Sequence, residues 1–511
     1  MSRTQNAIKN AFAGVISKVL NLIFAFAART VFIYVLGDTY LGVNGLYSEI
    51  LMFLSVAELG FGSAMTFAMY KPVVDNDRQK IIQLLCFYKK IYRIIAIVIV
   101  VLGLCTVPFL NYIVKGAEWL SYRELVLFFL IYLFNTFIGY FVSYKYTYLN
   151  ALQKNYVQTN IDTVIAIVTY IVQIIAIVVF KSFWGYLLIN SFVLLCSRLF
   201  IISYLDKKYP ILKEMASVPL DNKTKKTIYE EVRGLAVHQF SSVAVHSTDN
   251  ILISMVSGAG VIGVGLISNY NLIMRGVLGF VQILFNSVTS GFGNLAATSS
   301  SKKFCEVFRE INFVNFWIYG FCSIALWILV PPFITIWIGA DKLVDNMAFT
   351  LIMVNCYLQG QSTAYNNARI AKGNFNKDKG WAFAQAITNL VVSVIAAKYL
   401  GLVGIYIGTV ASRLVYVMFR PYSTYKFLFE ESSIEYYKKL LQYFINVIIA
   451  ALLTKLCVIK LVSTITVLSF VVMMFIVLIV PNAVFLILNC KSEEFAICRN
   501  RIAACVTKVR R

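Results

Sequence analysis

The chain has 511 residues, of which 59% are hydrophobic and only 14% are charged, with a formal net charge of +22 at pH 7. Soluble globular domains carry about 25% charged residues, so this composition excludes a soluble fold. Apolar runs of about 20 residues recur from end to end, and each is long enough for a helix to cross a bilayer. The sequence predicts an all-α polytopic membrane protein.

Fourteen transmembrane helices are expected in chain order, separated by short polar or glycine-containing turns. They lie at 11–36, 42–70, 83–113, 124–149, 156–180, 183–205, 229–256, 261–296, 311–338, 346–371, 375–399, 402–428, 440–459 and 463–489. The third begins with the cations Lys89, Lys90 and Arg93, which are typical of the membrane–water interface.

The charge distribution predicts the orientation and several absences. Of the 46 lysines and arginines, 30 lie in the tails and loops of one side, so the positive-inside rule places both chain ends in the cytoplasm. The basic tail CRNRIAACVTKVRR suits anionic lipid headgroups better than nucleic acid. Ten cysteines without a CxxC pair and two histidines predict no disulfide framework, metal site or cofactor.

Four short segments recur at a nearly constant spacing of 219 to 224 residues, which indicates an internal duplication. The matches are GDTYLGV at 37–43 with GAGVIGV at 258–264, VPFLNYI at 107–113 with PPFITIW at 331–337, LNALQKNY at 149–156 with ARIAKGNF at 368–375, and FWGYLLIN at 183–190 with LVGIYIGT at 402–409. We infer two six-helix repeats related by a pseudo-two-fold axis along the membrane normal, an arrangement typical of transporters with a site between the halves.

This duplication divides the chain into four expected parts. They are an N-lobe of six helices at 1–205, a cytoplasmic linker at 206–227, a C-lobe of six helices at 228–428, and two further helices with a basic cytoplasmic tail at 429–511.

Charged side chains inside the apolar segments are the candidate functional residues of the first repeat, because a charge in hydrocarbon requires a partner or water. Depth in the membrane can be counted from the outer turn at 37–42 with a helical rise of about 1.5 Å per residue. By this count Arg29 and Glu49 lie at similar depths, and so do Lys18 and Glu58. Such pairs either stabilise helix packing or face a wet pathway. We favour packing for Glu58, and Glu49 is the better candidate for the pathway.

The second repeat carries its own set, with His246 and Asp249 on the seventh helix and Arg275 on the eighth. If each repeat turns its first two helices to the centre, these residues join Lys18 and Arg29 around one net-positive cavity. Guanidinium groups bind phosphate oxygens through paired hydrogen bonds, so Arg29 and Arg275 are the expected substrate-binding residues, with Lys18 as a third. The alternative is that these charges only pair adjacent helices.

The chain resembles a known family over essentially its whole length, and two stretches carry the most specific part of the likeness. RTVFIYVLGDTYLGVNGLYSEILMFLSVAELGFGSAM at 29–65 and STDNILISMVSGAGVIGVGLISNYNLI at 247–273 are similar to bacterial polysaccharide-transport proteins. These are the Wzx-type flippases of capsule and O-antigen repeat units, in the multidrug/oligosaccharidyl-lipid/polysaccharide (MOP) exporter superfamily. The likeness is carried by the LGxxYLGxxGL turn and by the ELGFGSA and TDNILIS segments.

The resemblance implies a flippase that moves a polyprenyl-pyrophosphate-linked oligosaccharide across the bacterial cytoplasmic membrane by alternating access, for cell-surface polysaccharide biosynthesis. Related flippases carry cavity arginines on the first and eighth helices, where Arg29 and Arg275 lie. Flipping changes no covalent bond, so we expect a transporter and not an enzyme. The membrane potential or a coupling H⁺ or Na⁺ would drive it, with Asp249 or Glu49 alternating between cation and base. The expected partners are membrane lipids and polysaccharide-assembly proteins, and we expect a monomer.

Two other functions compete with this interpretation. An ion-coupled exporter of small organic cations would share the superfamily, but both candidate arginines would repel its substrate. A membrane-embedded polysaccharide polymerase or ligase would need a sizeable outer loop, whereas the outer connections here are about ten residues long, as at 113–123.

Overall fold

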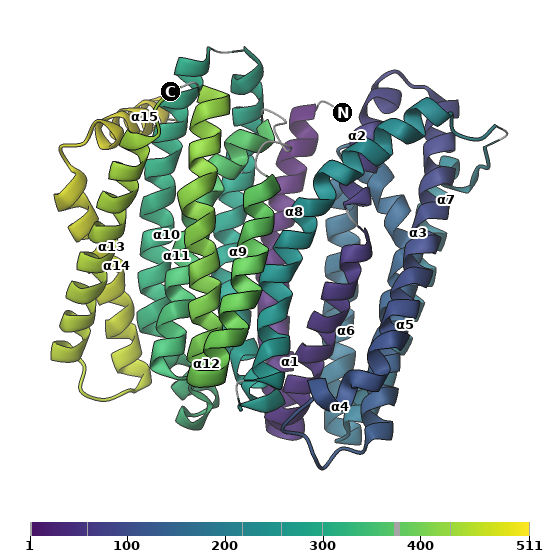
Figure 1. The fold of residues 1–511 in the computed structure, drawn as a ribbon, viewed down its shortest axis with the longest axis horizontal. Coiled ribbons are helices and arrows are strands. Elements are labelled where there is room, and N and C mark those ends of the chain that lie inside the picture. The colour runs from purple at the N-terminus through teal and green to yellow at the C-terminus, as the bar shows by residue number, and fades with distance from the viewer. Residues whose placement is uncertain are drawn as a thin grey trace. The chain divides into compact units, whose positions relative to one another are not determined.

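The structure is a computed structural model that describes residues 3–58, 60–216, 218–256, 258–298, 300–371, 379–429 and 431–509. Secondary structure in these ranges is entirely helical (Figure 1). The α-helices are α1 (Arg3–Leu54), α2 (Phe61–Val74), α3 (Arg78–Thr106), α4 (Leu110–Ile113), α5 (Tyr122–Ala151), α6 (Asn155–Phe180), α7 (Phe183–Lys208), α8 (Asn222–Met255), α9 (Gly260–Thr298), α10 (Ser301–Ile338), α11 (Asn346–Ala371), α12 (Lys379–Thr424), α13 (Ile434–Leu461), α14 (Val467–Asn489) and α15 (Glu493–Val509).

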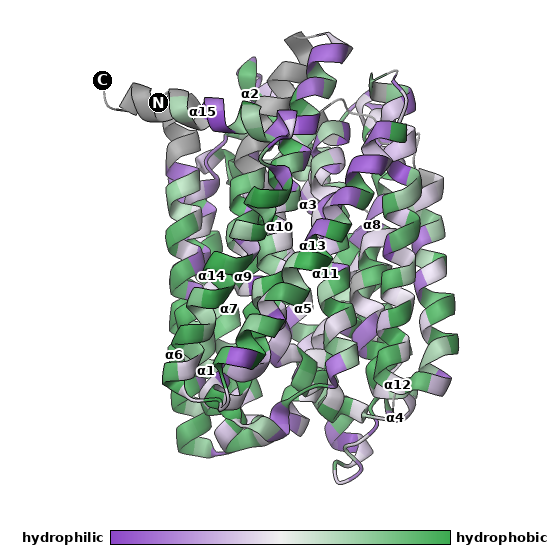
Figure 2. Cartoon of the chain, turned by 90° about the vertical axis from the view of Figure 1, so that its left-hand side faces the viewer, coloured by the Kyte–Doolittle hydropathy of each residue, from purple (hydrophilic) through white to green (hydrophobic). Residues whose placement is uncertain are grey.

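Ten described segments are long and apolar enough to cross a membrane. Helix α1 contains the first predicted span and part of the second, and α12 contains most of two further spans. Gly37 and Gly401 have positive φ and break these two helices internally. Helices α8 and α11 match predicted spans in length but are more polar. In Figure 2, apolar residues dominate along the helices and hydrophilic ones gather toward their ends. The prediction of an all-α polytopic membrane protein is confirmed.

The second predicted span, 42–70, is not one continuous helix. It comprises the second half of α1, the 3₁₀ segment η1 (Ser55–Glu58) and α2. Gly60 lies between them in the left-handed region at φ 79°, and a Cβ there would come 3.1 Å from the Cβ of Leu235 on α8. A residue other than glycine would therefore be strained at the break.

Residues with positive φ recur at the spacing of the sequence repeat. Three pairs lie 220 to 223 residues apart: Gly37 with Gly258, Gly116 with Gly339, and Lys181 with Gly401. Each marks a turn between helices or a break inside one, so equivalent points of the two repeats have the same backbone handedness. This regularity supports the proposed duplication.

The described helices form two compact units. The first comprises Met1–Leu272 with Ala397–Leu402, and the second comprises Ile273–Ala396 with Val403–Arg511. The predicted N-lobe lies wholly in the first unit. The same unit also contains α8 and the first turns of α9, which were predicted to belong largely to the C-lobe. One reason is a backbone hydrogen bond of 2.7 Å from Val261 of α9 to Lys115, which follows α4. The lobe boundaries drawn from the sequence remain a prediction.

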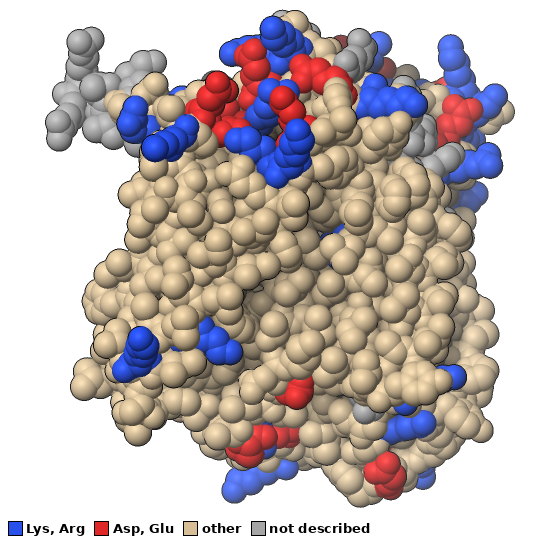
Figure 3. Space-filling view, turned by 60° about the vertical axis from the view of Figure 1, so that its left-hand side comes forward, with Lys and Arg blue, Asp and Glu red and all other residues tan. Residues whose placement is uncertain are grey.

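The second unit has an aromatic core in which α13 and α14 pack on α10. Phe316 of α10 stacks on Tyr443 of α13 with ring centroids 4.2 Å apart, and Phe485 of α14 lies 5.1 Å from Phe316. Gly320 provides room for this packing, because a Cβ there would lie 2.9 Å from Val447. On the face drawn in Figure 3, charged side chains gather near the helix ends and leave a broad, almost uncharged band. This is the distribution that a bilayer requires.

Candidate functional site

Arg29 is fixed in the first unit by polar side chains of α9. It is half-buried on α1, and its Nη1 donates to Ser268 Oγ at 2.6 Å and to Asn269 Oδ1 at 3.2 Å. The Ser268 hydroxyl donates in turn to the Gly265 carbonyl at 2.8 Å. These bonds from α9 orient the guanidinium.

Small residues allow α1 and α9 to approach closely enough for these bonds. A Cβ on Gly42 would overlap the carbonyl of Val261, and a Cβ on Gly265 would lie 2.5 Å from the carbonyl oxygen of Asp38. Close backbone approach at glycine is a common basis of helix association in membranes. The two segments in contact are GDTYLGV and GAGVIGV, which the sequence comparison also paired as equivalents in the two repeats.

Buried polar atoms lie on the helices next to Arg29. Asn269 is 1% exposed and its Nδ2 is buried without a hydrogen-bond partner among the described residues, and the same holds for the hydroxyl of Ser247 on α8. Tyr170 of α6 and Tyr186 of α7 lie within electrostatic reach of Arg29. Buried polar atoms of this kind are normally satisfied by ordered water or a ligand. The region therefore has the chemistry of a hydrated site.

The other predicted site residues of the first unit lie on α1 and α8. Glu49 is buried in the second half of α1, with 8% of its surface exposed, and Asp249 is half-buried on α8. Lys18 is half-buried in the first half of α1. His246 belongs to α8, but its side chain lies outside the described residues. The pairing of Arg29 with Glu49 stays a prediction.

Arg275 lies farther along α9 and belongs to the second unit, where its side chain is exposed. It follows Ser268 by seven residues, which is close to two helical turns. Ser268 and Arg275 therefore share one face of α9.

The pairing of Lys18 with Glu58 stays a prediction, and the side-chain hydrogen bond that the structure shows at Glu58 comes from α3. The Glu58 carboxylate accepts a hydrogen bond from Tyr92 Oη of α3, and Tyr92 accepts from Tyr88 Oη at 2.9 Å. Equal depths require a straight second helix, but the helix breaks between η1 and α2, and Glu58 lies next to α3. A tyrosine in an apolar helix carries no sequence signal for this role, because membrane-interface tyrosines are common.

Sequence reasoning did not select a second group of buried polar residues, which lies in the second unit. Arg413 and Arg420 of α12 are 5% and 4% exposed. Arg413 Nε donates to Asn355 Oδ1 of α11 at 3.2 Å, and the guanidinium of Arg420 lies 4.1 Å from the ring centroid of Tyr416. Gln361 of α11 is 0% exposed, and both its amide atoms are buried without a partner among the described residues. The sequence signal for this group was the position of Arg413 well inside the apolar segment 402–428.

Comparison with known proteins yields structural similarity only. No protein-family model matches the chain, and no curated protein sequence matches it. Three solved structures illustrate the likeness. The lipid II flippase MurJ in an inward closed conformation is 15% identical, with TM-score 0.66 over 94% of this chain and 98% of that chain. An inward-facing multidrug resistance MATE transporter of the MOP superfamily is 16% identical, with TM-score 0.60 over 80% and 96%. The Vibrio cholerae MATE transporter VcmN, in a mutant form, is 13% identical, with TM-score 0.58 over 84% and 100%.

These similarities show that the chain has the fold of MOP-superfamily transporters. Residues 434–511 make up about 15% of the chain, so the MurJ match over 94% must include most of that region. The shared fold therefore extends beyond the twelve helices of the two repeats into α13 and α14.

Proposed function

We propose that the chain is a transporter that flips a polyprenyl-pyrophosphate-linked oligosaccharide repeat unit across the bacterial cytoplasmic membrane. It would act by alternating access, with both chain ends in the cytoplasm, and would supply cell-surface polysaccharide biosynthesis. The pyrophosphate would bind the arginines, the glycan would occupy hydrated space between the repeats, and the polyprenyl chain would remain in lipid.

The observation that carries the proposal is the fixation of Arg29 by α9. Ser268 and Asn269 hold the guanidinium on the helix that also carries Arg275, on the face shared by Ser268 and Arg275. We infer that Arg29 and Arg275 each bind oxygens of a dianionic group, because each guanidinium can donate two parallel hydrogen bonds. A small organic cation would be repelled by the same pair.

The likeness to a lipid II flippase supports a lipid-linked substrate, since that match spans both repeats and most of 434–511. The equally evident likeness to MATE transporters supports the second candidate, an ion-coupled exporter of small molecules. The arginines favour the first candidate. A coupling ion, H⁺ or Na⁺, would exchange at Asp249 or Glu49, with His246 and Lys18 as further polar groups of the pathway.

The proposal is tested in vesicles that contain the purified protein and a fluorescent polyprenyl-pyrophosphate oligosaccharide. We expect rapid exchange between leaflets with the wild type, and a loss of at least tenfold in rate for Arg29→Ala and Arg275→Ala. Arg29→Lys keeps the charge but loses the forked donor, so it should be intermediate. Lys90→Ala removes an exposed cation from α3 and serves as the control.

Each outcome bears on a different part of the proposal. Normal exchange in both arginine variants would refute the assignment of the pyrophosphate site. Absence of exchange with the wild type, together with export of a cationic dye by the same vesicles, would favour the small-molecule exporter.

A further inference from the structure

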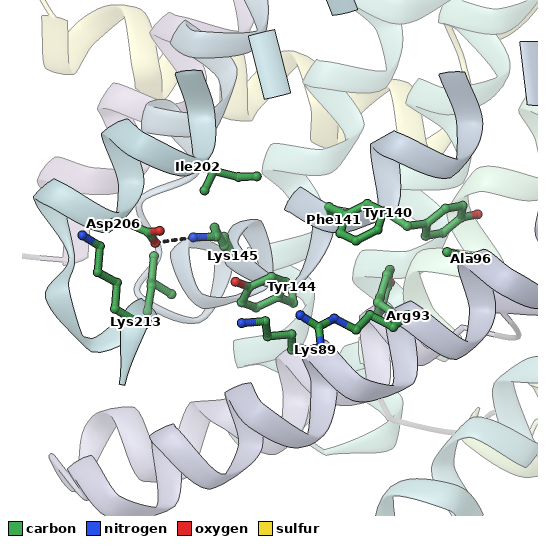
Figure 4. A pocket seen from close by; sticks show the side chains of 12 residues that line it. Lys89, Arg93, Ala96, Tyr140, Phe141, Tyr144, Lys145, Ile202, Asp206 and Lys213 are labelled. Atoms are coloured by element: carbon green, nitrogen blue, oxygen red, sulfur yellow. Dashed lines mark hydrogen bonds and ion pairs between the residues drawn. The ribbon is translucent and has the colours of Figure 1, made fainter. Parts of the chain in front are cut away.

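A cavity of about 380 Å³ lies in the first unit, lined by the middle of α3, the second half of α5 and the end of α7. Figure 4 shows side chains from α3, α5 and α7 entering it, together with residues of the 3₁₀ segment η3 (Pro210–Lys213). Its lining combines four cations and one acid with aromatic rings: Lys89, Tyr92, Arg93, Ala96, Tyr140, Phe141, Tyr144, Lys145, Ile202, Asp206, Leu212 and Lys213.

The acid in this cavity is already neutralised. Lys145 and Asp206 form an ion pair, with side chains that are 2% and 14% exposed. The remaining cations, Lys89, Arg93 and Lys213, are exposed, and none of the three is in an ion pair within the part of the chain that the structure describes. The cavity therefore has an excess of about three positive charges, which makes it complementary to an anion.

Tyr144 is placed at the centre of these charges. The ammonium groups of Lys89 and Lys145 lie 5.8 and 5.5 Å from the centroid of its ring, and Lys89 and Arg93 extend toward it from α3 in Figure 4. Cation–π contacts of this kind hold flexible cations in place before a ligand arrives.

An apolar groove of about 340 Å³ continues from the same two helices. Its first residue on α3, Ile97, follows Ala96 of the cavity, and its last residue on α5, Phe137, lies one turn from Tyr140. The groove is lined only by Ile97, Val100, Val101, Leu104, Leu130, Leu133, Phe134 and Phe137, and it follows α3 for about 10 Å at the helical rise. The groove residues thus continue the faces of α3 and α5 that line the cationic pocket, in steps such as Arg93 to Ile97 and Phe141 to Phe137, and their apolar side chains suit a hydrocarbon chain.

We propose that this surface is a specific binding site for an anionic glycerophospholipid of the membrane. The phosphate binds Lys89, Arg93 and Lys213, and one acyl chain lies along the groove between α3 and α5. A free phosphate would leave the groove unused. A zwitterionic lipid would place its own positive charge next to the three cations of the pocket. The site differs from the Arg29 region and does not depend on the proposed function.

The test measures lipid binding to the purified full chain, by mass spectrometry of intact protein–lipid complexes. The probes are phosphatidylglycerol, phosphatidylcholine with the same chains, and glycerol phosphate, which has no chain. The triple variant Lys89→Gln/Arg93→Gln/Lys213→Gln removes the pocket cations. A matched triple variant, Lys90→Gln/Lys207→Gln/Lys208→Gln, removes the same charge from neighbouring positions of α3 and α7 that do not line the cavity.

We expect wild type to prefer phosphatidylglycerol over both other probes by at least tenfold. Each removed pocket cation should weaken its binding about fivefold, and hence about 100-fold for three, while the matched variant stays near wild type. Val101→Trp, which fills the groove, should weaken phosphatidylglycerol binding at unchanged pocket charge. Equal weakening in both triple variants would refute a specific site, and so would tight binding of glycerol phosphate. Tighter binding of a polyprenyl phosphate than of phosphatidylglycerol would refute the assigned occupant.

Discussion

Glu58 lies at the end of a chain of hydrogen bonds between side chains of α5, α3 and η1. Thr147 Oγ1 donates to Tyr88 Oη at 3.3 Å, Tyr88 donates to Tyr92, and Tyr92 donates to the carboxylate. A Cβ on Gly62 would lie 3.1 Å from Glu58 Oε1 and 3.2 Å from Tyr92 Oη, so the carboxylate is enclosed where α2 begins. This series of hydrogen bonds satisfies the Glu58 carboxylate next to the break in the membrane helix.

Removal of one hydroxyl from this chain should therefore destabilise the protein. We predict that Tyr92→Phe lowers the free energy of unfolding by about 1–2 kcal/mol, because a carboxylate away from water loses its donor. Glu58→Gln keeps an acceptor and should be milder. Unfolding in mixed micelles measures both, and in the double variant the two effects should not add, because the residues share one bond. Strict additivity would show that the bond contributes nothing.

Single residues also show where sequence reasoning stops. Arg29 is recognisable because a cation inside an apolar run demands an explanation. Its partners Ser268 and Asn269 are 239 and 240 residues away, and ordinary polar residues at such a distance carry no signal of contact. Lys145 lies near the end of the predicted span 124–149, and the packing of α7 against α5 buries it against Asp206, which the sequence does not indicate.

At the scale of helices, the Lys145–Asp206 pair joins α5 to α7. We predict that Asp206→Asn destabilises the protein by about 3–5 kcal/mol, because it leaves a buried ammonium without its counter-charge, close to Lys89 and Lys213. Lys145→Met/Asp206→Leu should recover most of the loss, since it removes both charges and fills the space. Thermal unfolding measures this, with Asp75→Asn at the exposed end of α2 as the control. A loss in Asp206→Asn no larger than in the control would contradict the argument.

The contact between α1 and α9 gives a sharper test of helix packing. We predict that Gly42→Ala strongly destabilises the fold, because its methyl group would overlap the Val261 carbonyl. Gly139→Ala, in α5, has no atom within 4 Å of the added Cβ and should be neutral or stabilising by up to about 1 kcal/mol through helix propensity. Folded yield and thermal unfolding of the two variants check this pair. Equal behaviour would mean that α1 and α9 can separate without loss.

At the scale of the whole chain, hydropathy was sufficient for the order of the helices and for the ten apolar spans of the described residues, because each crossing needs about 20 apolar residues. It could not locate the break beside Gly60, which depends on contacts with α3 and α8. The repeat was visible because turns at Gly37 and Gly258 require the same left-handed backbone. The proposed site residues Asp249 and Arg275 lie on α8 and α9, where polar side chains obscure the periodic pattern.

The orientation of the chain provides the last prediction. The excess of lysine and arginine on one set of loops predicts that the segment after α7 is cytoplasmic and that the segment before α5 is outside. In a cysteine-free background, Met215→Cys and Glu118→Cys would each offer an exposed thiol, since Met215 is 89% exposed and Glu118 is also exposed. A membrane-impermeant maleimide applied to intact spheroplasts should label Glu118→Cys only, and both variants should be labelled after permeabilisation. The reverse pattern would overturn the predicted cytoplasmic placement of both chain ends, because the same charge count assigns the linker and the two ends to one side.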